Sequence, residues 1–191
     1  MTAQSVPYAA RLQIDHPTAQ LDRLTTFFRP IWAIPILVIA AALTGIGWFA
    51  TALMIAARQR YPRWWFDYSR ELTRFTTRVG AYCALMTDHY PSTEDEQEVH
   101  LELDYPDVKV SLNRWMPLIK WFLAIPHYVV LFFAWIVAFF AVVIAWFAIL
   151  FTGRYPEALF AYMTGVIRWT LRVSAYAFLM VTDTYPPFSL S

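Results

Sequence analysis

Two long stretches of the chain contain no Asp, Glu, Lys or Arg. The first covers residues 30–57 and the second covers residues 121–153. Each exceeds the roughly 20 residues that a helix needs to cross a ~30 Å hydrocarbon layer. Of the 191 residues, 59% are hydrophobic and only 15% are charged, whereas soluble domains carry about 25% charged residues. We therefore expect an all-α integral membrane protein of the multi-pass type, in which these runs form long helices.

The same landmarks occur twice along the chain. Arg-Tyr-Pro stands at 60–62 and again at 154–156, and Ala-Ile-Pro stands at 33–35 and again at 124–126. A repeated order of landmarks indicates an internal duplication. We expect two tandem copies joined by an acidic linker, with the first copy at 8–91, the linker at 92–98 and the second copy at 99–188.

Each copy shows the same elements in the same order. It begins with a short segment in which polar and apolar residues alternate, at 10–15 and at 99–104. Such alternation is typical of a strand, although an extended tail on lipid headgroups fits it equally well. Two helices follow in each copy, expected at about 31–57 and 64–87 in the first and at about 121–152 and 157–182 in the second. Gly45 and Gly47 would allow a kink or a close helix contact in the first of them.

The second helix of each copy carries arginines at a spacing of four residues. A period of 3.6 residues places them on one stripe with a tyrosine, which gives the matched sets Arg74, Arg78, Tyr82 and Arg168, Arg172, Tyr176. This helix either crosses the membrane with its stripe facing protein or water, or lies flat as an amphipathic helix at the interface.

The strands favour the first choice. Four crossings would bring both strands to the same side, where they could pair. The N-terminus, the linker and Ser191 would then lie on one face, expected to be cytoplasmic, and both Arg-Tyr-Pro turns on the other. Two crossings with two interfacial helices is the alternative.

The second copy resembles a bacterial membrane family known only as a domain of unknown function. The resemblance rests on the run at 150–156, the amphipathic helix after it, and the ending Thr-Asp-Thr-Tyr-Pro-Pro-Phe at 182–188. Two-copy forms are typical of actinobacterial members. The first copy departs at 57–60 and at 92–93. The resemblance implies a long apolar helix followed by an Arg-bearing helix, in the bacterial plasma membrane, and it implies no activity.

Few residues suggest chemistry. Cys83 is the only cysteine, and none of the four histidines has a ligand-type residue at metal-binding spacing. His127, beside Pro126, fits a structural or interfacial role. No nucleophile or phosphate-loop motif is present, and the net charge of +1 gives no indication of a nucleic-acid partner. We expect no enzyme activity, no cofactor and no metal site.

The charged residues that both copies share suggest lipid contact. Arginines within or beside a membrane pair with carboxylates of the same protein, bind lipid headgroups or line the path of a solute. We expect anionic headgroups on the two arginine stripes, and structural ion pairs between Arg23 and Asp88 and between Arg114 and Asp183.

The function expected from these features is non-catalytic. We expect an accessory or scaffold subunit of a larger membrane complex, or a lipid-contacting protein. The alternatives are a small transporter or channel with an arginine-lined polar path, and a membrane-shaping protein.

Overall fold

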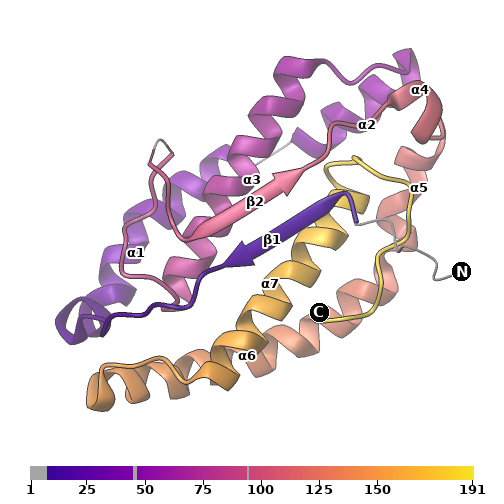
Figure 1. Cartoon of the computed structure of the whole chain (residues 1–191). Helices are drawn as coiled ribbons and strands as arrows, with labels where there is room; N and C mark the ends of the chain where they lie inside the picture. The colour runs from indigo at the N-terminus through magenta and orange to yellow at the C-terminus, as the bar shows by residue number, and fades with distance from the viewer. Residues whose placement is uncertain (1–7, 45–46, 94) are drawn as a thin grey trace, which may run out of the picture.

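The computed structural model describes residues 8–44, 47–93 and 95–191. Within these ranges the chain is mostly helical, with one small strand pair (Figure 1). The elements in chain order are β1 (Ala10–Ile14), α1 (Arg23–Leu43), α2 (Gly47–Arg58), α3 (Arg63–Cys83), β2 (Val99–Leu103), α4 (Val108–Ser111), α5 (Met116–Leu123), α6 (Ile125–Thr152) and α7 (Glu157–Ala177).

Each long apolar run forms two helices instead of one. The helix expected at 31–57 begins earlier, at Arg23, and is divided into α1 and α2. The division follows Leu43. Gly47, one of the two glycines expected to allow a kink, begins α2, while Gly45 lies outside the described residues. The helix expected at 121–152 is divided into α5 and α6 at Ala124. Here Pro126 explains the break, because proline cannot donate the hydrogen bond that would continue α5.

The Arg-bearing helices end sooner than the sequence predicts. α3 stops at Cys83 rather than residue 87, and α7 stops at Ala177 rather than residue 182. Within three residues of each helix end the backbone enters the left-handed region, at Leu85 (φ 66°) and at Met180 (φ 56°). Non-glycine residues adopt this conformation only occasionally, and both copies do so shortly after the helix ends.

The two predicted strands exist and pair with one another. β1 and β2 run antiparallel, with Leu12 opposite Leu101 and Arg11 opposite Glu102. One face of the pair is buried and carries the apolar side chains, while the other face is polar, which is the pattern that the alternation predicts. The prediction of strands rather than extended tails is confirmed.

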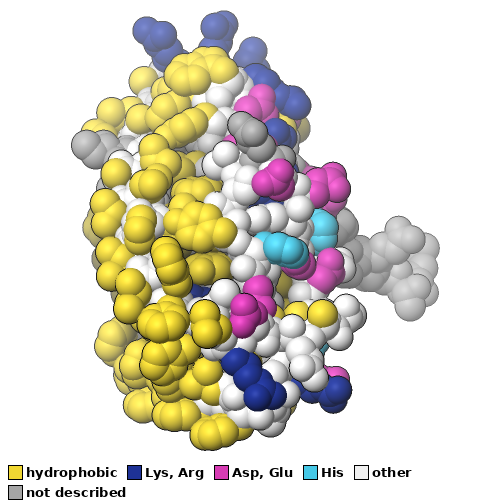
Figure 2. Space-filling model, turned by 90° about the vertical axis from the view of Figure 1, so that its left-hand side faces the viewer, with side chains coloured by type: hydrophobic (Ala, Val, Ile, Leu, Met, Phe, Trp, Pro, Cys, Tyr) yellow, Lys and Arg dark blue, Asp and Glu magenta, His cyan; other side chains and the backbone are white. Residues whose placement is uncertain are grey.

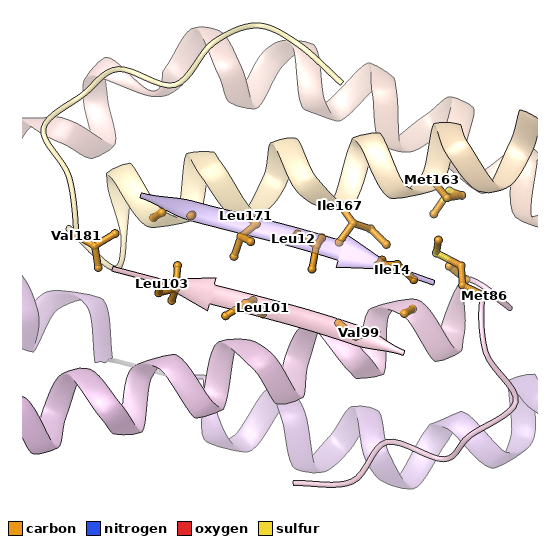
Figure 3. Close-up of a cluster of buried hydrophobic side chains, with 14 of the residues drawn as sticks. Leu12, Ile14, Met86, Val99, Leu101, Leu103, Met163, Ile167, Leu171 and Val181 are labelled. Atoms are coloured by element: carbon orange, nitrogen blue, oxygen red, sulfur yellow. The ribbon is translucent and has the colours of Figure 1, made fainter. Parts of the chain in front are cut away.

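Each strand covers the Arg-bearing helix of the other repeat. β1, from the first repeat, packs on α7, and β2, from the second, packs on α3. Figure 3 shows the result around β1, where Leu12 and Ile14 meet Ile167 and Leu171 of α7. Because the strands are exchanged, neither repeat can bury its apolar surfaces without the other.

The two helical hairpins point in opposite directions. The turn between α2 and α3 (59–63) lines the same cavity as residues 105–109, while the turn between α6 and α7 (152–157) lies beside residues 16–20. Figure 1 shows these turns at opposite ends of the molecule. The turns therefore do not lie together at one end of the molecule, as the arrangement with four crossings would require. The repeats are antiparallel, because the two exchanged strands pair antiparallel.

Candidate functional site

Asp88 and Asp183, which end the two repeats, are each held in a buried charge cluster. Asp88 forms an ion pair with Arg29 of α1, whose side chain is 2% exposed. Asp183 forms the matching pair with Lys120 of α5, with 2.6 Å between Nζ and Oδ1 and a lysine side chain that is fully buried. We call these the first and the second charge cluster. They are the most deeply buried ion pairs among the described residues.

Backbone groups complete both clusters in the same way. The Asp22 N–H donates to Asp88 Oδ2 at 2.7 Å, and the Asn113 N–H donates to Asp183 Oδ2 at 2.6 Å. The cations also donate to main-chain carbonyls, from Arg29 Nη1 to Thr87 O and from Lys120 Nζ to Thr182 O, both at 2.8 Å. Hydrogen bonds to an ionised group are the strong ones, and these tie the end of each repeat to its first helix.

The predicted stripe tyrosines close the two clusters. The Arg29 guanidinium lies 4.6 Å from the centre of the Tyr82 ring, and the Lys120 ammonium lies 5.3 Å from that of Tyr176. Both distances fall within the range of a cation–π contact. Tyr82 and Tyr176 are therefore internal parts of the clusters, and neither faces a headgroup.

The structure corrects the basic partners of the two aspartates. Arg23 is exposed in the first turn of α1, and Arg114 donates from Nε to Ala56 O at the end of α2 at 2.8 Å. The residues that reach the aspartates stand six positions further on, where α1 and α5 face inward. Arg29 and Lys120 are matched in the two repeats, but the change from arginine to lysine concealed the match.

The arginine stripes bind protein groups. Arg78 donates to Ser92 O at 2.6 Å, and Arg172 donates to Ser191 O at 2.8 Å. Each thereby holds the segment that follows its own helix. Both are buried.

The outer arginines of the stripes differ from one another. Arg168 donates from Nε to Leu12 O of β1 at 3.1 Å, whereas Arg74 pairs with Glu71 at 2.7 Å on its own helix. Three of the four stripe arginines, Arg78, Arg168 and Arg172, therefore bind a strand or a chain end, while Arg74 pairs within its own helix.

An extensive apolar face covers the opposite side of the molecule from the strands. In Figure 2 the hydrophobic side chains gather on one side, and the acidic and histidine side chains on the other. Its exposed members come from α1, α2, α5 and α6, and include Phe27, Ile31, Trp32, Val38, Phe49, Trp121, Phe122, Phe132, Phe133, Phe139, Phe140 and Phe151. The largest apolar patch of a soluble monomer covers about 300–600 Å². A continuous face of four helices indicates contact with lipid or with a partner.

The face opposite carries the polar side of the strand pair. Arg11 bonds to Glu102 at 3.0 Å and to Asp104 at 2.9 Å, and the His100 and Asp15 side chains lie 3.1 Å apart. The pKa of the Asp15 carboxyl is lowered because Gln13 and then His100 hydrogen-bond to it. This network is solvated, so its ion pairs contribute little to stability.

Nothing in the described residues forms a metal centre, since no group of three or more His, Cys, Asp or Glu side chains converges there. His127 is buried beneath the last segment of the chain, where its Nδ1 accepts a hydrogen bond from the Trp169 indole at 3.1 Å and its ring stacks on Phe188. This placement suits a packing role for His127.

Comparison with known proteins supports the duplication and adds no activity. The profile of a family described as "Domain of unknown function (DUF4389)" matches the chain twice, at residues 23–93 and at 114–189. No curated protein and no solved structure matches it. The two matched segments begin at α1 and just before α5, and they end at the segments held by Arg78 and Arg172. Each therefore contains the aspartate, the cation and the tyrosine of one charge cluster.

Proposed function

Since the chain belongs to the DUF4389 family, which brings no assigned activity, we propose a function from its surfaces. The protein is a non-catalytic membrane protein that lies in one leaflet of a bacterial plasma membrane. Its apolar face contacts the acyl chains and its strand face is displayed to water. In this position it acts as an accessory or scaffold subunit, with a membrane protein complex as the partner of the strand face.

The observation that carries the proposal is the one-sided distribution of apolar side chains. α1 and α6 are long and apolar enough to cross a membrane, but a protein that spans a membrane needs an apolar belt on every lipid-facing side. Here most of the exposed large apolar residues belong to α1, α2, α5 and α6. α3 and α4 add a few, such as Trp64 and Val110, while α7, described in full, exposes no large apolar side chain. A one-sided apolar surface is the pattern of a protein that lies in the interface.

The position of the strand pair argues against a multi-pass arrangement. β1 lies along the middle of α7, where Leu12 meets Arg168. If the helices crossed the bilayer, the exposed Arg11–Glu102 pair would stand at membrane depth, where a central charge costs about 2.5–3.5 kcal/mol on insertion scales. The open strand edges would also lack hydrogen-bond partners in hydrocarbon. Four crossings, and two crossings with interfacial helices, are both disfavoured for this reason.

Membrane shaping is a second candidate, favoured by the same asymmetry. A protein inserted into one leaflet expands that leaflet alone and so bends the membrane, as an inserted amphipathic helix does. Purified protein added to liposomes should then tubulate them. The transporter or channel alternative is less favoured, because Arg78 and Arg172 donate to main-chain carbonyl groups.

Cysteine labelling in intact vesicles tests the proposed position. In a Cys83→Ala background, single cysteines would replace Gln13 on the strand face, Lys109 at one end of the molecule and Arg154 at the other. The proposal requires all three to react with an impermeant maleimide from the same side. Labelling of Lys109→Cys and Arg154→Cys from opposite sides would show that the helices cross. Met163→Cys, at a position only 1% exposed, is the unreactive control.

A further inference from the structure

A basic cavity lies where the first repeat turns from α2 into α3. Its walls are residues 59–63 and 105–109, and its volume is about 620 Å³. Three exposed cationic side chains line it, those of Arg60, Arg63 and Lys109. The Arg63 guanidinium is held 4.8 Å from the centre of the Tyr105 ring. Asp107 is the one carboxylate among the lining residues, and it accepts a hydrogen bond from the Lys109 N–H at the start of α4.

A corresponding cavity lies at the turn between α6 and α7 of the second repeat, but its lining residues carry a different charge. There the walls are residues 16–20 and 152–157, and the volume is about 530 Å³. Arg154 corresponds to Arg60, but Glu157 stands in place of Arg63, and Gln20 stands in place of Lys109. Among the lining residues, the first cavity therefore has an excess of two positive charges, whereas the second is balanced when His16 is neutral. Outside the lining, Asp67 lies 3.7 Å from Arg63.

The basic cavity stands at the edge of the apolar face. Trp64, next to Arg63, is 68% exposed, and Val110, next to Lys109, is 85% exposed. Figure 2 shows Lys and Arg side chains gathered at the end where Figure 1 places α4, with the apolar face directly beside them. Tryptophan together with basic residues is the signature of the level at which phospholipid headgroups lie.

We propose that this cavity binds the phosphate of an anionic phospholipid whose acyl chains lie against the apolar face. Arg60, Arg63 and Lys109 supply the positive charge, and arginine forks suit phosphate oxygens. The balanced cavity of the second repeat has no such preference. This inference rests on the proposed function, because only a protein at the leaflet surface brings the cavity to headgroup height.

Native mass spectrometry of the full chain tests the assignment. The protein would be mixed in detergent with equal amounts of phosphatidylglycerol and phosphatidylcholine that carry identical acyl chains. The detergent would then be removed in the mass spectrometer, and the lipids that stay bound would be measured. We expect wild type to retain phosphatidylglycerol in preference. In the Arg60→Gln, Arg63→Gln, Lys109→Gln triple variant, the ratio of retained phosphatidylglycerol to phosphatidylcholine should fall at least about fivefold. This is the factor expected for one basic residue near a membrane surface. Arg154→Gln, the matched control, should keep it.

The possible failures are distinguishable. Equal retention of both lipids by wild type, or loss of the preference in Arg154→Gln to the same extent as in the triple variant, overturns the assignment and leaves the proposed function standing. Retention of neither lipid overturns both. Excess inorganic phosphate separates the sources of phosphate. If it abolishes the preference when chloride of equal ionic strength does not, the cavity is a free-phosphate site and the lipid assignment is wrong.

Discussion

The first and second charge clusters have one geometry but different cations. Each aspartate accepts a backbone N–H from the segment just before a helix, each cation donates to a threonine carbonyl, and each cation lies over a tyrosine ring. Arginine fills the cation position in one repeat and lysine fills it in the other. The comparison shows that the position, rather than the residue type, is what the fold requires. Because the two clusters correspond position by position, a substitution in one repeat can be compared with the matching substitution in the other.

Removing the carboxylate charge should have the largest effect. Asp88→Asn leaves Arg29 buried and unpaired, which is expected to cost about 3–5 kcal/mol of unfolding free energy. Asp183→Asn should cost less, because burial lowers the pKa of Lys120 and an unpaired lysine can lose its proton, whereas arginine stays charged. The loss for Asp183→Asn should therefore shrink as pH rises, while that for Asp88→Asn stays constant. Denaturant melts in detergent at neutral and alkaline pH measure both, and equal pH dependence would contradict the comparison.

Truncating a strand should weaken the helix of the other repeat. Leu12→Ala removes a side chain that is 5% exposed and should cost about 2–4 kcal/mol. Hydrogen exchange should then rise in α7 rather than in α3, because β1 packs on α7. Leu101→Ala should show the reverse. Val110→Ala, at a position 85% exposed, is the control. Loss of protection confined to the mutated strand's own repeat would refute the exchange.

Exchanging the cation should have a moderate effect. Arg29→Lys keeps the charge, and Lys120 shows that an ammonium group can bond both to the aspartate and to the threonine carbonyl. We expect a loss of about 1 kcal/mol, the typical net contribution of one hydrogen bond, as measured by the same melts. A loss as large as that of Asp88→Asn would mean that the guanidinium itself is required.

The exposed network of the strand pair should contribute least. The Arg11 side chain is 41% exposed and its partners Glu102 and Asp104 are 71% and 54% exposed. Arg11→Gln should therefore change the unfolding free energy by at most about 1 kcal/mol, and less at high salt. An effect comparable to that of the buried clusters would mean that a further group covers this face.

The sequence predicted repeated features better than it predicted directions. Periodicity identified both strands, and the duplication identified Asp88 and Asp183 as cluster members. The pattern does not tell which basic residue of α1 faces inward, because that depends on how the helix packs. It therefore predicts Arg23 as the partner of Asp88, whereas the structure has Arg29. An unbroken apolar run also resembles a membrane span whether the helix crosses the bilayer or lies along it. That distinction depends on the strand exchange, a contact between residues about 90 positions apart along the chain.

The depth of α6 in the bilayer tests the central claim most directly. Spin labels would replace Val129, Val137, Ile144 and Phe151 in turn, all exposed on the apolar face, in the Cys83→Ala protein. The first and last of these sites lie about 33 Å apart along the helix axis at 1.5 Å per residue. Collision rates with oxygen and with a water-soluble nickel complex report the depth of each label. A helix within one leaflet predicts similar depths at all four sites. A depth that passes from one interface through the bilayer centre to the other would contradict the account.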